Sequence, residues 1–266
     1  MILLVREDRE YLREPGAVLE TDLGVLEVPA EPMPGEELET HLGTVFTVRE
    51  PRGPDFARHF ERTGAPMLPR DIGLVIGHTG VGAGDRALDV GTGTGVLAAY
   101  LGRLDVNVVT YERNPEAAAV AHENMALAGV SEAVDVREGE ALDDIEALSA
   151  GTDEADTDRA DTDGSDSDRT DFDERSEAFD LVTLDTADAP AMVERTPELL
   201  VSGGFCAVYS PFVESAREVV ETAREVGLTV DTYETIQREL DVDERGTRPT
   251  TGGVGHTGFL SICRRE

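Results

Sequence analysis

Apolar and polar positions change their pattern along this chain, and the change separates two regions. From Arg86 onward, short apolar runs typical of buried strands alternate with longer stretches of helical character. The predicted strands span residues 86–90, 107–112, 134–137, 179–185 and 204–210, with a closing pair near 228–234 and 257–264. The predicted helices span residues 94–103, 115–128, about 190–201 and about 213–226. This alternation predicts an α/β fold with a doubly wound sheet.

The first part of the chain has a different pattern. Strand-like runs at 17–28 and 44–49 are separated by turn residues such as Pro15-Gly16 and Pro34-Gly35. We therefore predict a small N-terminal β domain over residues 1–62 and a larger domain over residues 63–266. A helix that starts near Asp71, after Pro69, is expected to lead into the larger domain.

An acidic segment interrupts the larger domain at residues 149–178. It contains twelve acidic residues, three arginines and almost no large apolar residue. A segment with so little to bury cannot offset the entropy lost on ordering, so we predict a disordered acidic insertion. Asp161-Thr162-Asp163-Gly164 is similar to the start of a calcium loop, but the remaining ligands of that motif are missing at the required spacing. We therefore predict no metal site.

The charge of the chain is strongly negative and unusual in kind. The formal net charge is −33, and every basic residue except histidine is an arginine. A dense carboxylate surface without lysine is typical of a halophilic protein from a high-salt cytoplasm. At such salt the Debye length falls to about 3 Å or less, so an acidic surface need not repel a nucleic acid. A local cluster of arginines would still be required for that partner.

The apolar runs also limit where the protein functions. None approaches the ~20 residues that a membrane-spanning helix needs. The two cysteines, Cys206 and Cys263, both lie in strand-like apolar surroundings, which favours two buried free thiols over a disulfide. We expect a soluble cytoplasmic protein with no membrane partner.

A glycine-rich loop, Asp89-Val90-Gly91-Thr92-Gly93-Thr94-Gly95, follows the first strand of the larger domain and precedes a helix. Glycines adopt backbone angles that a Cβ forbids, and the helix that follows presents free N–H groups to a ligand. A tight turn without a ligand can have the same sequence. The position between strand and helix favours a cofactor loop built from Asp89, Gly91, Thr92, Gly93, Thr94 and Gly95.

Glu112 ends the next strand about twenty residues beyond the loop, where an acidic side chain can bind the two hydroxyls of a ribose. The alternative is a carboxylate that caps the following helix. A dinucleotide loop would prefer the spacing G-x-G-x-x-G, which is absent here. The acidic Asp89 just before the loop instead suits a ligand that carries an amino group.

Several segments together resemble the tRNA adenine-N1 methyltransferases, a class I S-adenosylmethionine-dependent family, in an archaeal, halophilic type. The segments that carry the resemblance are Leu68-Pro69-Arg70-Asp71, the glycine loop with its strand from Gly84, Tyr111-Glu112-Arg113, Val208-Tyr209-Ser210-Pro211 and Gly255-His256-Thr257-Gly258-Phe259-Leu260. The resemblance covers almost the whole chain except the acidic insertion. It implies a Rossmann-like seven-stranded sheet with a small N-terminal β domain.

The resemblance also implies an activity and a set of site residues. The expected reaction transfers a methyl group from S-adenosylmethionine to N1 of a T-loop adenosine in tRNA, and the expected assembly is a homotetramer. Arg113, Glu140 and Asp185 join the expected cofactor-binding residues, with Glu140 beside the adenine. Asp185 and Tyr209 are the expected catalytic residues. Without that role, Asp185 could cap a turn and Tyr209 could pack as a core aromatic.

Two segments depart from the family pattern on the acceptor side. Asp185-Thr186-Ala187-Asp188-Ala189-Pro190 replaces a Pro-rich, Trp-containing run, and Ala65-Pro66-Met67-Leu68 replaces a segment that usually carries Gln and Tyr. Two alternatives therefore stay open: a methyltransferase of the protein-L-isoaspartate type or of another class I type, and a non-catalytic cofactor-binding subunit. His256 is interpreted as a hydrogen-bonded turn residue in preference to a catalytic one.

Overall fold

A seven-stranded sheet forms the centre of the computed structural model, which describes residues 1–149, 178–252 and 255–266. Its strand order is β12-β15-β11-β10-β7-β8-β9. The strands are β7 (Arg86–Val90), β8 (Asn107–Glu112), β9 (Val134–Glu138), β10 (Phe179–Leu184), β11 (Leu200–Ser210), β12 (Thr229–Glu234) and β15 (Phe259–Arg264). Strands β7 to β11 pair in parallel, in the sheet order β11-β10-β7-β8-β9, whereas β15 pairs antiparallel with β11 and β12. The predicted Rossmann-like sheet is confirmed.

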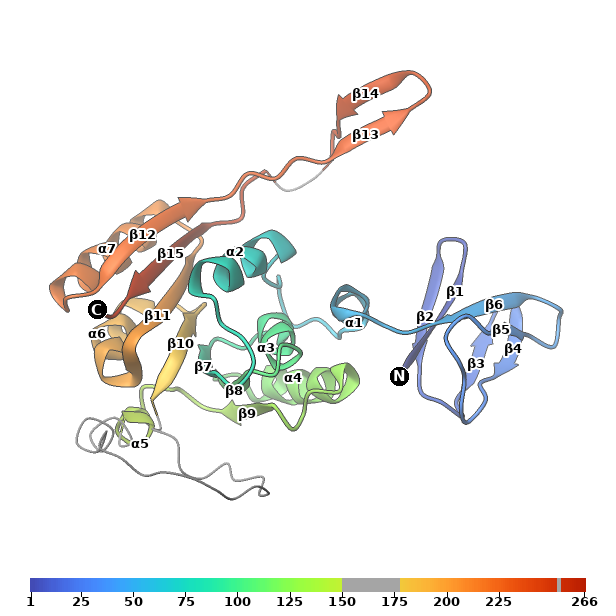
Figure 1. Ribbon diagram of the computed structural model, residues 1–266, viewed down its shortest axis with the longest axis horizontal. Coiled ribbons are helices and arrows are strands. Elements are labelled where there is room, and N and C mark those ends of the chain that lie inside the picture. Colours follow the sequence, from blue (N-terminus) through green and yellow to red (C-terminus); the bar gives the residue numbers. More distant parts are fainter. Residues whose placement is uncertain (150–177, 253–254) are drawn as a thin grey trace, which may run out of the picture.

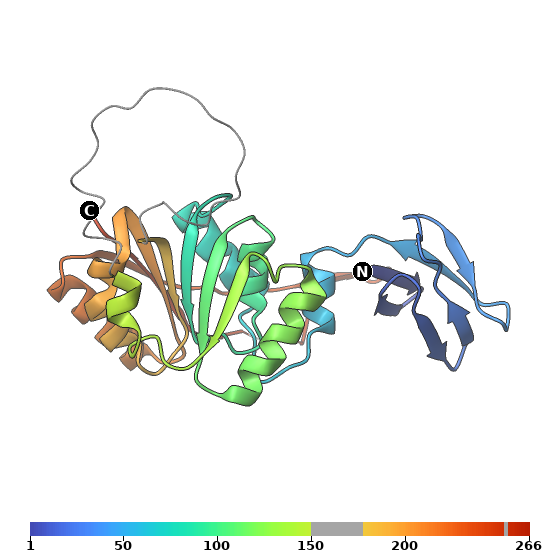
Figure 2. The ribbon, with the colours of Figure 1, turned by 90° about the horizontal axis from the view of Figure 1, so that it is seen from below.

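Helices cover both faces of this sheet (Figures 1 and 2). Helices α2 (Pro69–Thr79), α3 (Val96–Gly102) and α4 (Pro115–Ala128) share one buried cluster with Ala87 of β7. Helices α5 (Ile145–Ser149), α6 (Ala189–Leu199) and α7 (Val213–Glu225) share the other cluster with Leu88. Successive residues of a strand point to opposite faces, so a strand covered on both faces is mostly apolar on both. This explains the continuous apolar runs in the sequence.

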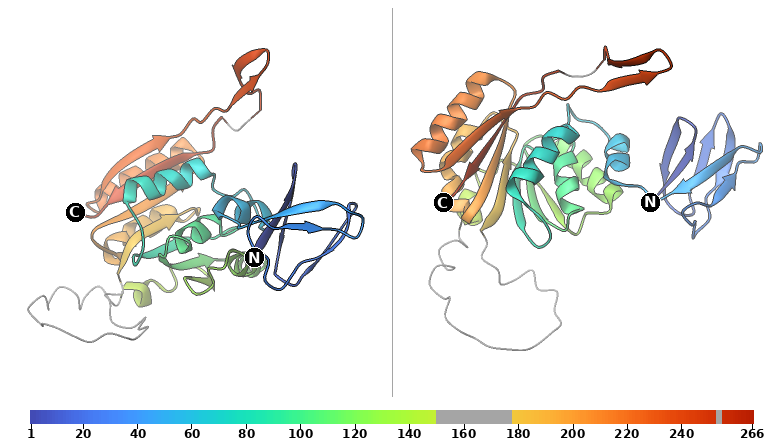
Figure 3. Two further views of the ribbon diagram at one scale, coloured as in Figure 1. Left: turned by 45° about the vertical axis from the view of Figure 1, so that its right-hand side comes forward. Right: turned by 45° about the horizontal axis from the view of Figure 1, so that its top comes forward.

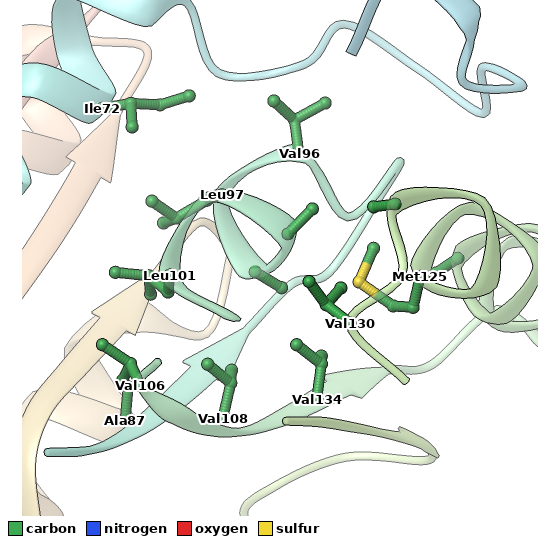
Figure 4. Close-up of a cluster of buried hydrophobic side chains, with 14 of the residues drawn as sticks. Ile72, Ala87, Val96, Leu97, Leu101, Val106, Val108, Met125, Val130 and Val134 are labelled. Carbon is green, nitrogen blue, oxygen red and sulfur yellow. The ribbon is translucent and has the colours of Figure 1, made fainter. Parts of the chain in front are cut away.

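The packing of α3 and α4 fixes the start of α3. Figure 4 shows Val96, Leu97 and Leu101 of α3 close to Met125 of α4, above Val108 and Val134 of the sheet. A Cβ built at Gly95, the N-cap of α3, would stand 2.6 Å from Cε of Met125. The loop before α3 is therefore held between two helices.

The N-terminal region consists of antiparallel strands that lie apart from the large sheet (Figures 1 and 3). One sheet has the order β2-β1-β6-β5, and β3 pairs with β4. The strands are β1 (Ile2–Arg6), β2 (Arg9–Arg13), β3 (Val18–Thr21), β4 (Gly24–Glu27), β5 (Glu37–Glu39) and β6 (Val45–Arg49). The strand-like run 17–28 is thus a hairpin, and the sequence did not reveal β1 and β2.

Helix α1 (Gly53–His59) connects the two regions by contacts on both sides. The guanidinium of Arg103, after α3, lies 4.8 Å from the ring centre of Phe56, and Arg58 donates to Glu10 of β2 at 3.1 Å. The predicted domain boundary at residue 62 follows this helix and stays a prediction. Of the predicted acidic insertion, only Ser149 and Ala178 belong to the described residues.

A two-stranded arm, which the sequence did not predict, extends away from the large sheet (Figure 1). Its strands are β13 (Leu240–Asp243) and β14 (Gly246–Pro249). Ile236, Leu240 and Val242 are 68%, 57% and 76% exposed along the arm and its base.

Among the described helices, none is long and apolar enough to cross a membrane.

Candidate active site

The glycine-rich loop turns sharply at the end of β7. Gly91, Gly93 and Gly95 have φ of +96°, +52° and +79°, a region that L-residues with a Cβ rarely adopt. The first of these positions also allows a close backbone approach, because a Cβ at Gly91 would stand 2.2 Å from the carbonyl oxygen of Asp185. The N–H of Asp185 donates to the carbonyl of Val90 at 2.9 Å. The loop and the end of β10 therefore form one packed unit.

Asp89 lies under the loop and is only 4% exposed. Its two carboxylate oxygens accept hydrogen bonds from Thr183 at 2.6 Å and Thr110 at 2.8 Å, in the strands on either side of β7. The hydroxyls of Thr92 and Thr110 are 2.5 Å apart. Since the proton of Thr110 goes to Asp89, Thr92 must donate to Thr110. Burial raises the pKa of Asp89 despite these hydrogen bonds.

Glu112 connects the loop to the end of β8. Its carboxylate accepts from the N–H of Gly93 and from the N–H of Asn114, both at 2.9 Å. The cap of helix α4 is Asn114, whose side chain accepts from Glu116 N and Ala117 N. Glu112 therefore does not serve as the helix cap. A carboxylate has about four acceptor sites, so two of them remain for a ligand.

A cavity of about 290 Å³ opens at the carboxyl ends of the parallel strands. In open α/β sheets this is the edge at which ligands bind. The residues that line it are Val90, Gly91, Gly93, Tyr111, Glu112, Arg113, Gly139, Glu140, Ala141, Leu142, Asp185, Thr186, Ala187, Asp188 and Met192.

The cavity brings six of the predicted site residues together: Gly91, Gly93, Glu112, Arg113, Glu140 and Asp185. Five others do not line it: Asp89, Thr92, Thr94, Gly95 and Tyr209. The apolar wall residues Tyr111, Leu142 and Met192 were not expected from the sequence. Their apolar character fits a strand or helix core equally well, so nothing in the sequence distinguishes a cavity wall from a core position.

Tyr111 lines the cavity and is also held by hydrogen bonds of its hydroxyl. Its side chain lines the cavity and is otherwise buried, with 2% of the residue exposed. Its hydroxyl donates to Asp144 at 2.9 Å and accepts from Arg137 at 3.1 Å. Burial is the main reason why the pKa of this tyrosine is raised. The two hydrogen bonds fix the ring in the cavity wall.

An ion pair joins two walls of the cavity. Nη1 of Arg113, directly after β8, lies 3.7 Å from Oδ2 of Asp188, which precedes α6. Both side chains are largely exposed, so the pair contributes little to stability. Its position at the cavity makes it a candidate contact for a bound ligand.

Asp185 has the most perturbed carboxyl group of the cavity wall. It follows β10, and the residue has exposed surface, but enough protein surrounds its carboxyl that burial raises the pKa to about 6. The negative charge of the neighbouring Asp89 adds to this increase. A carboxyl group with this pKa can change its protonation near neutral pH, which general base chemistry requires.

Tyr209 lies near the end of β11, on the β15 side of Asp185. Burial raises the pKa of its phenol, and the charge of Asp185 acts in the same direction. Its ring packs on Gly258, where a Cβ would stand 2.7 Å from the ring carbon Cζ. Nearby, Nδ1 of His256 lies 2.7 Å from a carboxylate oxygen of Glu234, so His256 holds the turn before β15.

The cavity fits an adenosine-containing cofactor. The glycine loop allows close approach to its main chain, and Glu112 keeps free acceptor sites. The hydroxyl of Thr94 lies outside the cavity lining, is buried and has no hydrogen-bond partner among the described residues. A parallel sheet with this loop, and with carboxylates at the ends of β8 and β10, defines a class I S-adenosylmethionine-dependent methyltransferase.

Comparisons with known proteins identify the family. The chain is 30% identical to the tRNA (adenine(57)-N(1)/adenine(58)-N(1))-methyltransferase TrmI of Methanocaldococcus jannaschii, over 97% of this chain and 92% of that protein. The chain therefore belongs to the TrmI family of tRNA (adenine-N1)-methyltransferases. No family model matches the sequence.

Two solved structures confirm the fold over the whole chain. A SAM-dependent O-methyltransferase of Thermotoga maritima has a TM-score of 0.72 at 24% identity, covering 99% of this chain and 92% of the other. The tRNA (m1A58) methyltransferase TrmI of Aquifex aeolicus has a TM-score of 0.68 at 19% identity, covering 100% and 96%. Both therefore include the N-terminal strands as well as the large sheet.

Proposed function

We propose that this protein methylates N1 of an adenosine in the T-loop of tRNA, using S-adenosylmethionine. The observation that carries the proposal is the placement of Asp185 between the cofactor cavity and Tyr209, with a pKa raised to about 6. Membership of the TrmI family over nearly the full chain supports the same substrate.

Different cavity residues bind different parts of the cofactor. Gly91 and Gly93 admit the ligand to the loop main chain, Glu112 binds the ribose hydroxyls, and Arg113 and Glu140 lie on the adenine side. Asp89, Thr92, Thr94 and Gly95 act mainly by holding the loop in shape, because they do not line the cavity. The bound cofactor supplies an electrophilic methyl group.

Asp185 and Tyr209 act on the acceptor. An adenine that gains a methyl group at N1 becomes positively charged. The carboxylate of Asp185 accepts a hydrogen bond from the N6 amino group, stabilises this charge and can take the N6 proton. Tyr209 closes the acceptor side of the pocket with its ring.

A second candidate is methylation of a carboxylate or hydroxyl oxygen. It is favoured by the segment after Asp185, in which Thr186, Ala187 and Asp188 line the cavity without an aromatic side chain that could stack on a base. A third candidate is a cofactor-binding subunit without catalysis.

One experiment separates these candidates. Wild type and Asp185→Ala are incubated in molar salt with unmodified tRNA or an isoaspartyl peptide and with tritiated S-adenosylmethionine, and the nucleosides are analysed. We expect 1-methyladenosine from the wild type and a loss of at least about 100-fold in the variant. Label in the peptide alone would favour the second candidate. Cofactor binding without transfer to either acceptor would favour the third.

We also propose that the protein is a homotetramer and that it functions in the high-salt cytoplasm of a halophile. The exposed apolar residues of the β13–β14 arm support assembly, since an isolated two-stranded hairpin is marginally stable in water. Assembly would also let arginines of several subunits line one tRNA path. The net charge of −33 without lysine supports the high-salt setting.

A further inference from the structure

Asp188 occupies the N-cap position of helix α6, but its side chain does not cap the helix. Aspartate is a preferred N-cap residue because its carboxylate can accept from the first free N–H groups of a helix. Here the carboxylate makes no cap hydrogen bond, and its Oδ2 lies 3.7 Å from Nη1 of Arg113 instead. The side chain of Asp188 is therefore directed at the opposite wall of the cofactor cavity and not at its own helix.

The two partners of this ion pair come from strands that are not neighbours. Arg113 follows β8 and Asp188 follows β10, whereas β7 lies between these strands in the sheet. Neighbouring strands lie about 4.8 Å apart, so the ends of β8 and β10 are separated by about 10 Å. The glycine loop follows β7 and lines the same cavity through Gly91 and Gly93. The ion pair thus links one side of the glycine loop to the other.

The ion pair lies on the solvent side of the cavity. The side chains of Arg113 and Asp188 are 62% and 49% exposed. By contrast, Tyr111 and Met192 also line the cavity but are only 2% and 1% exposed, and they form its buried wall. A ligand held against the buried wall would have the ion pair between itself and the solvent on this side.

The choice of partner by Arg113 matters for Glu112. Among the described residues that line the cavity, Arg113 is the only basic one, and four are acidic: Glu112, Glu140, Asp185 and Asp188. Glu112 precedes Arg113 in the sequence and is the expected ligand of the ribose hydroxyls. A guanidinium paired with Glu112 would occupy acceptor sites that the ribose needs. Of the four carboxylates, only Asp188 forms an ion pair with Arg113.

We propose that Asp188 is a positioning residue for the cofactor, which holds Arg113 across the solvent side of the cavity, slows release of the cofactor and keeps the guanidinium away from Glu112. Asp188 acts through Arg113. The inference rests on the cofactor site of the proposed function and not on the identity of the methyl acceptor. Because both side chains are exposed, the expected effect on release is about threefold.

A double-mutant cycle on cofactor release tests the proposal. The dissociation rate of S-adenosylhomocysteine is measured by surface plasmon resonance in molar salt for the wild type, Asp188→Asn, Arg113→Gln and the double variant. We expect Asp188→Asn to accelerate dissociation about threefold when Arg113 is present and less than about 1.3-fold in the Arg113→Gln background. Asp188→Glu, which keeps the charge, should retain slow dissociation.

A matched control comes from the same helix. Arg195→Gln removes an exposed ion pair with Glu198 of α6, and neither residue lines the cavity, so dissociation should not change. The unfolding midpoints of all variants are compared with that of the wild type. If Asp188→Asn lowers the midpoint, Asp188→Ser takes its place in the cycle, because serine removes the carboxylate and is itself a preferred N-cap residue.

The outcomes separate this inference from the proposed function. A wild type that does not bind S-adenosylhomocysteine contradicts the cofactor site, and with it the proposed function. If the wild type binds but loss of the Asp188 carboxylate leaves dissociation unchanged, the positioning role alone is wrong. The same conclusion follows if that loss accelerates dissociation equally with and without the guanidinium of Arg113.

Discussion

The backbone of Gly91 packs directly against the backbone of Asp185, so that a Cβ on the glycine would stand 2.2 Å from the aspartate carbonyl oxygen. The cofactor loop and the expected catalytic carboxylate are thus positioned by one contact between strand ends. A displacement at Gly91 would move both.

Gly91→Ala should therefore lower stability and cofactor binding together. The added Cβ meets backbone, and φ of +96° is unfavourable for alanine, so we expect a loss of about 2–4 kcal/mol in the free energy of unfolding. Gly93→Ala is the matched control, because nothing lies within 4 Å of its Cβ position, and it should cost about 1 kcal/mol. Chemical denaturation and calorimetric titration with S-adenosylhomocysteine measure both. Equal losses of stability in the two variants would contradict the packing role of Gly91.

Methyl transfer should depend on the protonation of Asp185. Its pKa is raised to about 6, so the carboxylate that accepts from N6 is lost as the pH falls through about 6. We expect the single-turnover rate to rise between pH 5 and 7 and then level off. Asp185→Asn should remove this rise of the rate with pH and lower the rate about 100-fold. If the rise persists in the variant, another titrating group causes it.

The same pKa shift predicts the sign of a stability change. Folding raises the pKa of Asp185, so the ionised form is disfavoured in the folded state at pH values above about 6. Asp185→Asn removes this cost and should raise the unfolding midpoint at pH 8. The variant should leave the midpoint unchanged at pH 3, where the carboxyl is protonated in both states. A lower midpoint at pH 8 would contradict the stated cause.

Asn124 should couple the cofactor loop to the segment before α2. It is 3% exposed on α4 and donates to the carbonyls of Thr94 at 2.9 Å and Glu61 at 3.0 Å, while it accepts from Glu61 N at 3.1 Å. Asn124→Ala should cost about 2 kcal/mol of stability and lower cofactor affinity about tenfold. Glu123→Ala, on the exposed face of the same helix, is the control. Unchanged cofactor affinity in Asn124→Ala would separate the helix from the loop.

Tyr111 should contribute to cofactor binding through its ring and to stability through its hydroxyl. Tyr111→Phe keeps the cavity wall but removes one hydrogen bond each from Asp144 and Arg137, so it should cost about 1 kcal/mol of stability and little affinity. Tyr111→Ala should lower affinity at least tenfold and cost about 3–5 kcal/mol of stability. Titration calorimetry distinguishes the two. Equal loss of affinity in both variants would give the hydroxyl the binding role.

The β13–β14 arm should carry the subunit contact. Introducing a charge with Leu240→Asp and Val242→Asp should reduce the mass of the assembly in molar salt, as measured by sedimentation. Val213→Asp adds a charge at an apolar residue of α7 that is 57% exposed and should leave the mass unchanged. An unaltered mass in the arm variant would place the contact elsewhere.

The sequence by itself determined the alternation of strands and helices. It also determined where the strands that carry the cofactor site end. Buried parallel strands read as continuous apolar runs, and Gly91, Glu112 and Asp185 follow directly from where three of these runs end. Even α4 could be delimited, because Pro115 marks its first turn and Gly129 its end. Such signals are local, so they survive without knowledge of the fold.

Only the tertiary structure decided which side chains meet. The sequence predicts that Asp89 binds the cofactor, but it does not show that its carboxylate accepts hydrogen bonds from Thr110 and Thr183, which lie 21 and 94 positions away. Arg70 donates to the hydroxyl of Thr257, which lies 187 positions away. The periodicity of apolar residues predicts which face of a helix or strand is buried. It does not predict which other helix or strand covers that face. The cavity walls, the buried polar clusters and the exposed β13–β14 arm all depend on which elements pack together. Only the tertiary structure shows that packing.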